Sequence, residues 1–293
     1  MSFVPAQGIL PFIELPFNFK QPAEPSRAER FMPRPVQLDV QIAASTAEVT
    51  NAAARLFAES VTEAVAARGL ARVAISGGST PKAMLGMLGD PAQPFCSSLP
   101  WAKLHLFWVD ERCVGPADPE SNYGMTKAAL LDKVPLPAGN IHRMEGELDP
   151  EEAASRYESE IRNAFRLEGA ETPTFDLILL GLGPDGHTAS LFPHTEGLNE
   201  MARIVIANHV PQKDTWRLTL TWPVIVQGRT VAFLIEGESK APMVRTVFTG
   251  AYDPETYPAQ LIRPASGKLI LLLDQAAAAG LPEGANTRNV ELS

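Results

Sequence analysis

The sequence predicts an α/β fold in which a mostly parallel sheet is covered by helices on both faces. Short apolar runs alternate along the chain with stretches of helical character, and this alternation is typical of parallel strands joined by helices. The run at residues 175–180 is almost continuously apolar, as expected for a strand that is buried on both faces.

Strands are expected, in chain order, at residues 36–42, 72–75, 104–109, 175–180, 204–207, 217–221, 231–235 and 269–273. The first of these runs alternates apolar and polar residues, which favours an edge position. Helices are expected at residues 46–69, from 81 onward, at 149–169, for about two turns between 187 and 193, and at 238–248. Ser45 and Glu48 form a capping box before the first helix. Thr80 is expected to cap the second helix, with Pro81 at its first position.

The length and the cysteine content limit the class of protein. The chain has 293 residues, which is enough for a sizeable core. We expect a single α/β domain at residues 36–293, preceded by a proline-rich arm at residues 1–35. Cys96 and Cys113 are the only cysteines, too few for a disulfide scaffold or a cysteine-based zinc site. A reducing, cytoplasmic location is therefore expected.

Charge and hydropathy limit the partners. Lys and Arg number 25 and Asp and Glu 34, a formal net charge of 25 − 34 = −9, and the pI is near 5.2. This balance disfavours nucleic acid and anionic membranes as partners. We find no apolar run of about twenty residues that would span a membrane, and the N-terminus lacks the basic region of a signal peptide. A small anionic substrate remains compatible, because a local cluster of amides and cations can bind it.

A glycine-rich loop follows the strand at 175–180. It has the pattern G-x-G-x-x-G at residues 181–186 and contains Asp185, with His187 directly after it. Ligands of open α/β sheets bind at the carboxyl ends of strands, so this loop is a site candidate, and Gly183 is expected to bring its backbone close to a ligand. The pattern matches the dinucleotide fingerprint, but Pro193 interrupts any following helix and no carboxylate ends the next strand. A plain turn, in which His187 bonds only to backbone, is the other alternative.

A second glycine-rich loop, Ser-Gly-Gly-Ser-Thr at residues 76–80, lies between a strand and a helix. Gly77 and Gly78 let backbone amides approach an anion, Ser79 and Thr80 add hydroxyl donors, and the helix N-terminus favours negative charge. The loop lacks the Walker pattern G-x-x-x-x-G-K-[ST]. We interpret it as a candidate phosphate cradle; the alternative is a capped turn without a ligand.

Charged side chains follow the buried strand at residues 104–109. Asp110 and Arg112 flank Glu111 there, and Arg112 is suited to clamp a phosphate through two hydrogen bonds. Asn122 comes shortly after, at an expected helix start, and is expected to complete the same wall. The alternative is a solvated loop.

Two further cations complete the candidate site. Arg217 lies in an alternating strand, and Lys240 lies at the start of a helix, where a cation opposes the helix dipole unless an anion is close. The alternative for each residue is an ordinary surface cation that binds no ligand. Other chemistries fit poorly, because neither a G-x-S-x-G nucleophile nor an H-E-x-x-H metal motif is present. Acid–base chemistry at His187 on a phosphate-bearing substrate remains.

These motifs resemble those of the 6-phosphogluconolactonases, in the glucosamine-6-phosphate isomerase/6-phosphogluconolactonase family. The matching segments fall in order over about residues 36–275, at residues 76–81, 108–112, 121–124, 182–193, 217–221, 238–240 and 258–264. The chain departs from the family at Trp222-Pro223, where Pro-Pro or a similar pair is usual. The arm at 1–35 lies outside the resemblance.

The resemblance implies a Rossmann-like fold shared with glucosamine-6-phosphate deaminase and ribose-5-phosphate isomerase. It implies hydrolysis of 6-phospho-D-glucono-1,5-lactone to 6-phospho-D-gluconate in the oxidative pentose phosphate pathway, by a monomer or weak homodimer without a metal or other cofactor. The histidine of the Asp-Gly-His motif is the family's proposed general base, here His187, with Asp185 and Arg112 as its active-site companions.

Two other functions stay open. Glucosamine-6-phosphate deaminases share the phosphate loop and Asp-Gly-His, but their motif continues His-Ile-Gly-Phe-Asn-Glu-Pro, whereas residues 187–193 read His-Thr-Ala-Ser-Leu-Phe-Pro. A non-catalytic sugar-phosphate sensor of this fold needs a DNA-binding module, which the acidic charge and the lack of a basic helix disfavour.

Overall fold

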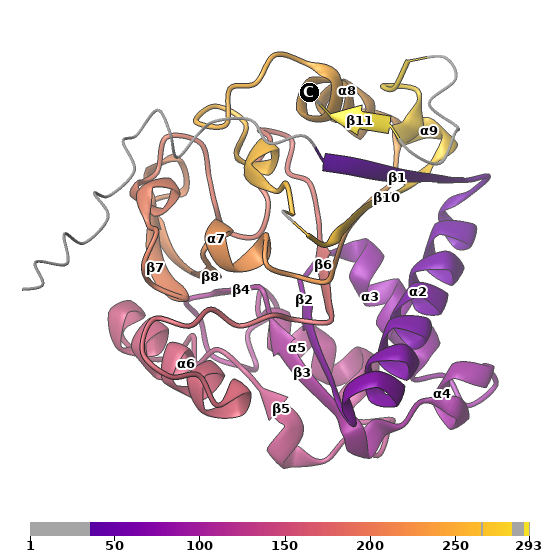
Figure 1. The fold of residues 1–293 in the computed structure, drawn as a ribbon, viewed down its shortest axis with the longest axis vertical. Helices are drawn as coiled ribbons and strands as arrows, with labels where there is room; N and C mark the ends of the chain where they lie inside the picture. The colour runs from indigo at the N-terminus through magenta and orange to yellow at the C-terminus, as the bar shows by residue number, and fades with distance from the viewer. Residues whose placement is uncertain (1–35, 265, 283–289, 293) are drawn as a thin grey trace, which may run out of the picture. The chain divides into compact units, whose positions relative to one another are not determined.

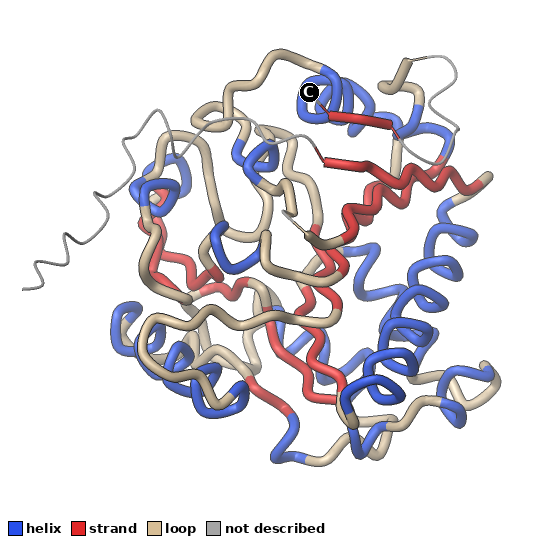
Figure 2. The backbone as a smooth tube through the Cα atoms, in the orientation of Figure 1, coloured by secondary structure: helices blue, strands red, loops and turns tan. Residues whose placement is uncertain are grey.

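The main sheet is mostly parallel, as the sequence predicts. The computed structural model describes residues 36–264, 266–282 and 290–292, so the expected arm at 1–35 lies outside the described residues. The strand order is β11-β1-β10-β9-β6-β2-β3-β5 (Figures 1 and 2). The strands are β1 (Val36–Ala43), β2 (Ala71–Ile75), β3 (Leu104–Trp108), β5 (Ile141–His142), β6 (Leu177–Leu180), β9 (Thr230–Ile235), β10 (Lys268–Asp274) and β11 (Val290–Leu292). All neighbours pair in parallel except β1 and β11, which are antiparallel.

The expected edge position of the first strand is wrong, because β11 pairs with β1 on its outer side. Alternation in β1 indicates which side chains are buried, but it does not show whether a further strand pairs with its backbone. That strand, β11, comes from the distant C-terminal segment.

A second, antiparallel sheet of three strands was not predicted. Its order is β4-β8-β7, formed by β4 (Asp110–Arg112), β8 (Thr215–Leu220) and β7 (Val205–Val210). The expectation that the runs at 204–207 and 217–221 join the main sheet is therefore wrong, and so is a loop at 110–112. Alternation indicates one buried face but does not identify the sheet to which a strand belongs.

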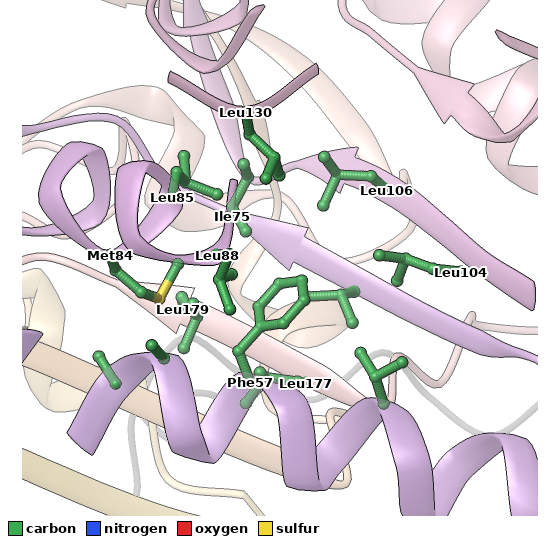
Figure 3. Packing of buried hydrophobic residues seen from close by; sticks show 14 of the residues in the cluster. Phe57, Ile75, Met84, Leu85, Leu88, Leu104, Leu106, Leu130, Leu177 and Leu179 are labelled. Atoms are coloured by element: carbon green, nitrogen blue, oxygen red, sulfur yellow. The ribbon is translucent and has the colours of Figure 1, made fainter. Parts of the chain in front are cut away.

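Helices cover both faces of the main sheet. They are α2 (Thr46–Arg68), α3 (Ser79–Leu88), α4 (Pro94–Ser98), α5 (Asn122–Thr126), α6 (Pro150–Phe165), α7 (Trp222–Ile225), α8 (Ala241–Thr249) and α9 (Gln275–Ala278). α2 and α3 lie side by side on one face (Figure 1), where Phe57 of α2 reaches into the apolar cluster between helices and strands (Figure 3). On the other face Phe107 lies 5.6 Å from Phe165 of α6 and Phe233 lies 5.4 Å from Phe248 of α8, between ring centroids.

The first helix begins and ends where the sequence predicts. Ser45 Oγ accepts the Glu48 amide at 3.3 Å, and Glu48 Oε2 accepts the Ala44 amide at 2.9 Å, one residue before the amide of a standard capping box. Gly69 ends α2 in the left-handed region, with φ 81°.

Two other helix predictions are wrong. α3 begins at Ser79 with Gly78 as N-cap, and the Thr80 hydroxyl does not cap the helix but donates to Glu236 Oε2 at 2.9 Å. No helix forms at 187–193; Thr188 and Leu191 make an isolated bridge instead.

Two helix boundaries also differ from the expected ones. α6 ends at Phe165 because Arg166 is left-handed, with φ 56°, and α8 is preceded by a 3₁₀ turn, η6 (Glu238–Lys240).

The strand order places a crevice between β2 and β6. From β2 the chain moves outward through β3 and β5, and it then returns to the opposite side of β2 and continues through β6, β9 and β10. Ligands bind at such a reversal, beyond the carboxyl ends of the strands. Both glycine-rich loops begin at this point. Among the described helices none is long and apolar enough to cross a bilayer.

Candidate active site

A cleft of about 340 Å³ opens at the carboxyl ends of β2, β6 and β9. The residues predicted for the site that line it are Gly77, Gly78, Ser79, Thr80, Asp110, Arg112, Asn122, Gly183, His187 and Lys240. Asp185 and Arg217 do not appear among the lining residues, although each is next to one: Asp185 bonds to His187, and Arg217 lies opposite Arg112. The structure therefore brings together residues from four separate segments of the chain, which follow β2, β3, β6 and β9.

Asp185 and His187 form a pair on the loop after β6. Asp185 Oδ1 is hydrogen-bonded to His187 Nδ1 and also accepts the His187 amide at 3.2 Å. Burial opposes ionisation of Asp185, but the hydrogen bond and the charge of the His187 ring outweigh it, so the pKa of the Asp185 carboxyl lies below its ordinary value. An ionised Asp185 accepts the Nδ1 proton, which leaves the lone pair of the neutral ring on Nε2.

Gly183 allows this pair to fold back on its own loop. A Cβ at this position would lie 2.0 Å from His187 Nδ1 and 2.7 Å from Asp185 Oδ1, and the Gly183 amide donates to the His187 carbonyl at 2.8 Å. A dinucleotide-binding loop requires a helix directly after the pattern G-x-G-x-x-G, and no helix follows Gly186. The pattern therefore does not indicate dinucleotide binding here.

The His187 imidazole stacks on an aromatic ring. The rings of His187 and Phe192 are 4.0 Å apart between centroids, at an interplanar angle of 23°, and Lys213 Nζ lies 5.7 Å from the centroid of the Phe192 ring. Phe192 is buried. Phe192 was not among the residues predicted for the site.

The loop between β2 and α3 presents backbone donors to the cleft. Gly78 has φ 116° and gives α3 no side-chain cap, so the first amides of the helix have no partner within it. A Cβ on Gly77 would lie 1.8 Å from Asn122 Oδ1, and Asn122 Nδ2 donates to the Asp110 carbonyl at 2.8 Å. Glycine therefore lets the neighbouring wall approach this loop closely.

Asp110 and Glu111 are buried carboxyls with different partners. Asp110 Oδ2 accepts the Ser190 hydroxyl at 2.8 Å; burial raises the pKa of Asp110, against that bond and the nearby cations. Glu111 accepts three backbone amides at 2.8 Å, those of residues 112, 122 and 123. Burial raises the pKa of Glu111, although these bonds favour its charged form. Glu111 thus fixes the start of α5, while Asp110 lines the cleft.

Two guanidinium groups belong to neighbouring strands of the second sheet. Arg112 and Arg217 are paired across β4 and β8. Arg112 Nη1 donates to the Glu120 carbonyl at 2.5 Å, and Arg217 Nη1 donates to Thr215 Oγ1 at 3.0 Å. Burial, and then the charge of Arg112, lowers the pKa of Arg217. Adjacent like charges repel, so an anion between or beside them is favoured.

Lys240 and Glu236 line the cleft from the segment that follows β9. Lys240 Nζ donates to the Leu182 carbonyl at 2.7 Å, which ties η6 to the loop that carries His187. Glu236 was not among the residues predicted for the site, but it lines the cleft and accepts the Thr80 hydroxyl. One carboxylate after an apolar strand is ordinary, but its position at a strand end is the same signal that selected Asp110. Within the described residues, no group of three His, Cys, Asp or Glu side chains is placed to hold a metal ion.

Known proteins resemble this chain in sequence and in structure. The model of the family described as glucosamine-6-phosphate isomerases/6-phosphogluconolactonase matches residues 44–271. A 6-phosphogluconolactonase of Synechocystis sp. is 45% identical over 222 residues, 75% of this chain and 89% of that protein. The solved 6-phosphogluconolactonase from Trypanosoma cruzi has a TM-score of 0.72 at 28% identity, covering 86% of this chain and 97% of its own. A monomeric glucosamine-6-phosphate deaminase, 22% identical with a TM-score of 0.68, covers 83% of this chain and 100% of its own and shares the fold.

Proposed function

The chain belongs to the glucosamine-6-phosphate isomerase/6-phosphogluconolactonase family, and from this premise we propose that it hydrolyses 6-phospho-D-glucono-1,5-lactone to 6-phospho-D-gluconate in the oxidative pentose phosphate pathway. The observation that carries the proposal is the Asp185–His187 pair, whose imidazole lines a cleft together with the uncapped N-terminus of α3 and with cations. A base and an anion-binding site in one cleft match a substrate that has a lactone carbonyl and a phosphate.

His187 acts as the general base in this proposal. Asp185 holds the Nδ1 proton, and Nε2 takes a proton from the attacking water as its oxygen bonds to the lactone carbonyl carbon. The tetrahedral intermediate then collapses, the bond from that carbon to the ring oxygen breaks, and the imidazolium returns the proton to the leaving oxygen. Arg112 or the loop amides stabilise the carbonyl oxygen as it becomes negative.

The phosphate binds at residues that hold the sugar in place. Supporting groups are the first amides of α3 together with the cations Arg112, Arg217 and Lys240. Lys240 already donates one proton to Leu182, and its ammonium group has two further protons for an anion. Binding of the phosphate positions the carbonyl against His187 and lowers the entropic part of the barrier.

The remaining expectations complete the proposal. We place the enzyme in the cytoplasm as a monomer or weak homodimer that binds neither nucleic acid nor membrane, consistent with its net charge of −9. Residues 36–293 form its single catalytic domain, and the reaction scheme uses no cofactor.

Acid release from freshly prepared 6-phosphogluconolactone tests the proposal, measured above the spontaneous rate and beside ammonia release from glucosamine 6-phosphate. We expect acid release without ammonia release. Ammonia release without enzymatic acid release would assign the chain to the deaminases instead. Unphosphorylated gluconolactone is the matched control substrate, and kcat/KM should fall strongly with it if the phosphate positions the sugar.

A further inference from the structure

Glu236 places a carboxyl group beside the amides proposed to hold phosphate. It follows β9, lines the cleft together with Ser79 and Thr80, and its Oε2 accepts the Thr80 hydroxyl at 2.9 Å. Thr80 lies in the first turn of α3, so this carboxyl is a direct neighbour of the helix N-terminus. A fixed carboxylate at that position repels any anion that binds to the same amides.

Resting on the proposed function, we propose that Glu236 sets the strength with which the cleft holds a doubly charged anion. Its ionised form weakens the binding of phosphate, and the anion binds most tightly when Glu236 carries a proton. The charge of Glu236 therefore lowers the affinity of the cleft for both substrate and product. Glu236 takes no part in the bond-breaking step.

The surroundings of the carboxyl group favour the protonated form. Glu236 Oε1 is enclosed by protein and has no hydrogen-bond partner, which is unfavourable for an ionised carboxylate. Burial, and then the charge of Asp274, raises the pKa of Glu236 against the effect of the Thr80 hydrogen bond. Because the pKa is raised, Glu236 stays neutral to a higher pH than an exposed glutamate and becomes repulsive as the pH rises further.

The charged groups around Glu236 come from several elements. Asp274 ends β10 and accepts the Gly237 amide at 3.0 Å, and Lys240 of η6 lines the cleft with its Nζ bonded to Leu182. The other charged or titratable groups lining the cleft are His187, Asp110 and Arg112. Among the described residues no cation lies within ion-pair distance of Glu236. The charge of Glu236 is therefore not cancelled locally, and a bound anion experiences it.

The test is a direct measurement of sulfate binding by calorimetry, because sulfate stays doubly charged over the working pH range. Wild type is compared with Glu236→Gln, which keeps an acceptor for Thr80 but removes the charge, and with Glu238→Gln, which removes an exposed charge two residues away. We expect Glu236→Gln to bind sulfate about tenfold more tightly than wild type at alkaline pH. The two affinities should converge as the pH falls, and Glu238→Gln should match wild type throughout. Taking the ratio of two proteins at each pH cancels the titration of His187, which both share.

Several outcomes would overturn the proposal. Equal affinities of wild type and Glu236→Gln at alkaline pH would do so, as would the absence of sulfate binding to both. A third variant, Glu236→Met, removes the charge and the hydrogen-bond acceptor together. If sulfate affinity rises in Glu236→Met but not in Glu236→Gln, the cause is the loss of the Thr80 hydrogen bond and not the loss of charge. The measurement does not use lactone turnover, so it is decided independently of the proposed reaction. In a protein with the lactonase activity, Glu236→Gln should also lower KM and strengthen inhibition by 6-phosphogluconate.

Discussion

Replacing Gly183 by alanine should displace the proposed base far more than the proposed phosphate contacts on other segments. The new Cβ would lie 2.0 Å from His187 Nδ1, whereas ordinary contact begins at 3.4 Å, so the ring must retreat by about 1.4 Å. A misplacement of about 1 Å is enough to cost about 10² in rate. We therefore expect kcat to fall by about 10² or more, with a smaller change in KM, because the phosphate contacts lie on other loops. The steric overlap should also cost about 1–3 kcal/mol of stability.

The matched control is Gly86→Ala, in the interior of α3, where a Cβ would have nothing within 4 Å. Alanine there should stabilise the helix by about 0.5–1 kcal/mol and leave kcat unchanged. Steady-state kinetics on freshly prepared lactone, thermal unfolding and sulfate binding would be measured for both variants. If Gly183→Ala keeps kcat within a few-fold of wild type and its fold is intact, the position of the His187 ring over this glycine is not needed for the reaction.

Five further outcomes are expected. His187→Ala should lower kcat by about 10²–10⁴ with less change in KM, and Asp185→Asn should lower it by less; kcat/KM of the wild type should fall as the pH falls, because protonation removes the lone pair. A folded His187→Ala protein with near-normal kcat would exclude His187 as the base and make Asp185 the next candidate. Dialysis against a chelator should leave kcat/KM unchanged, and recovery on adding a divalent ion after a loss would contradict the proposed chemistry. Tyr157→Phe should lower the free energy of unfolding in urea by about 1–3 kcal/mol, since the buried hydroxyl accepts the Trp108 amide at 2.9 Å and donates to its carbonyl at 3.0 Å; an unchanged midpoint would show that these groups find other partners.

Six strands of the main sheet, β1, β2, β3, β6, β9 and β10, could be predicted because their sequence pattern reports their burial; the short strands β5 and β11 were not predicted. Residues 177–180 are buried on both faces of the sheet, and such a strand needs consecutive apolar side chains. The second sheet lacks this signal. β4 consists of Asp110, Glu111 and Arg112. The buried carboxylate of Glu111 is tolerated because backbone amides of α5 donate hydrogen bonds to it. Those partners are set by the fold and cannot be read from the local sequence.

The predicted site residues converge because strand ends converge. Parallel strands place their carboxyl ends along one edge of a sheet, so loops after β2, β3 and β6 meet there whatever the details of each loop. The failures concern side-chain direction. Thr80 is a suitable N-cap by type, but its hydroxyl donates to Glu236, a residue 156 positions away in the chain. Glu236 was not predicted as a site residue for a related reason. The group that it contacts, the start of α3, lies far from it in sequence.

Two errors of prediction have one cause: a helix was wrongly expected at 187–193, and the second sheet was not predicted. The segment is extended and turned, with Ala189 at φ 51°, because the second sheet satisfies its polar groups. Ser190 donates from its amide to Thr219 Oγ1 at 3.3 Å and from its hydroxyl to Asp110 Oδ2 at 2.8 Å, and its carbonyl accepts Asn208 Nδ2 at 2.9 Å. Each partner belongs to a different strand of that sheet, β8, β4 and β7. A helix would have to satisfy the same groups internally and would remove Ser190 from all three strands. The second sheet therefore holds the loop that carries His187, and it determines the shape of that loop in a way that local helix propensity cannot reveal.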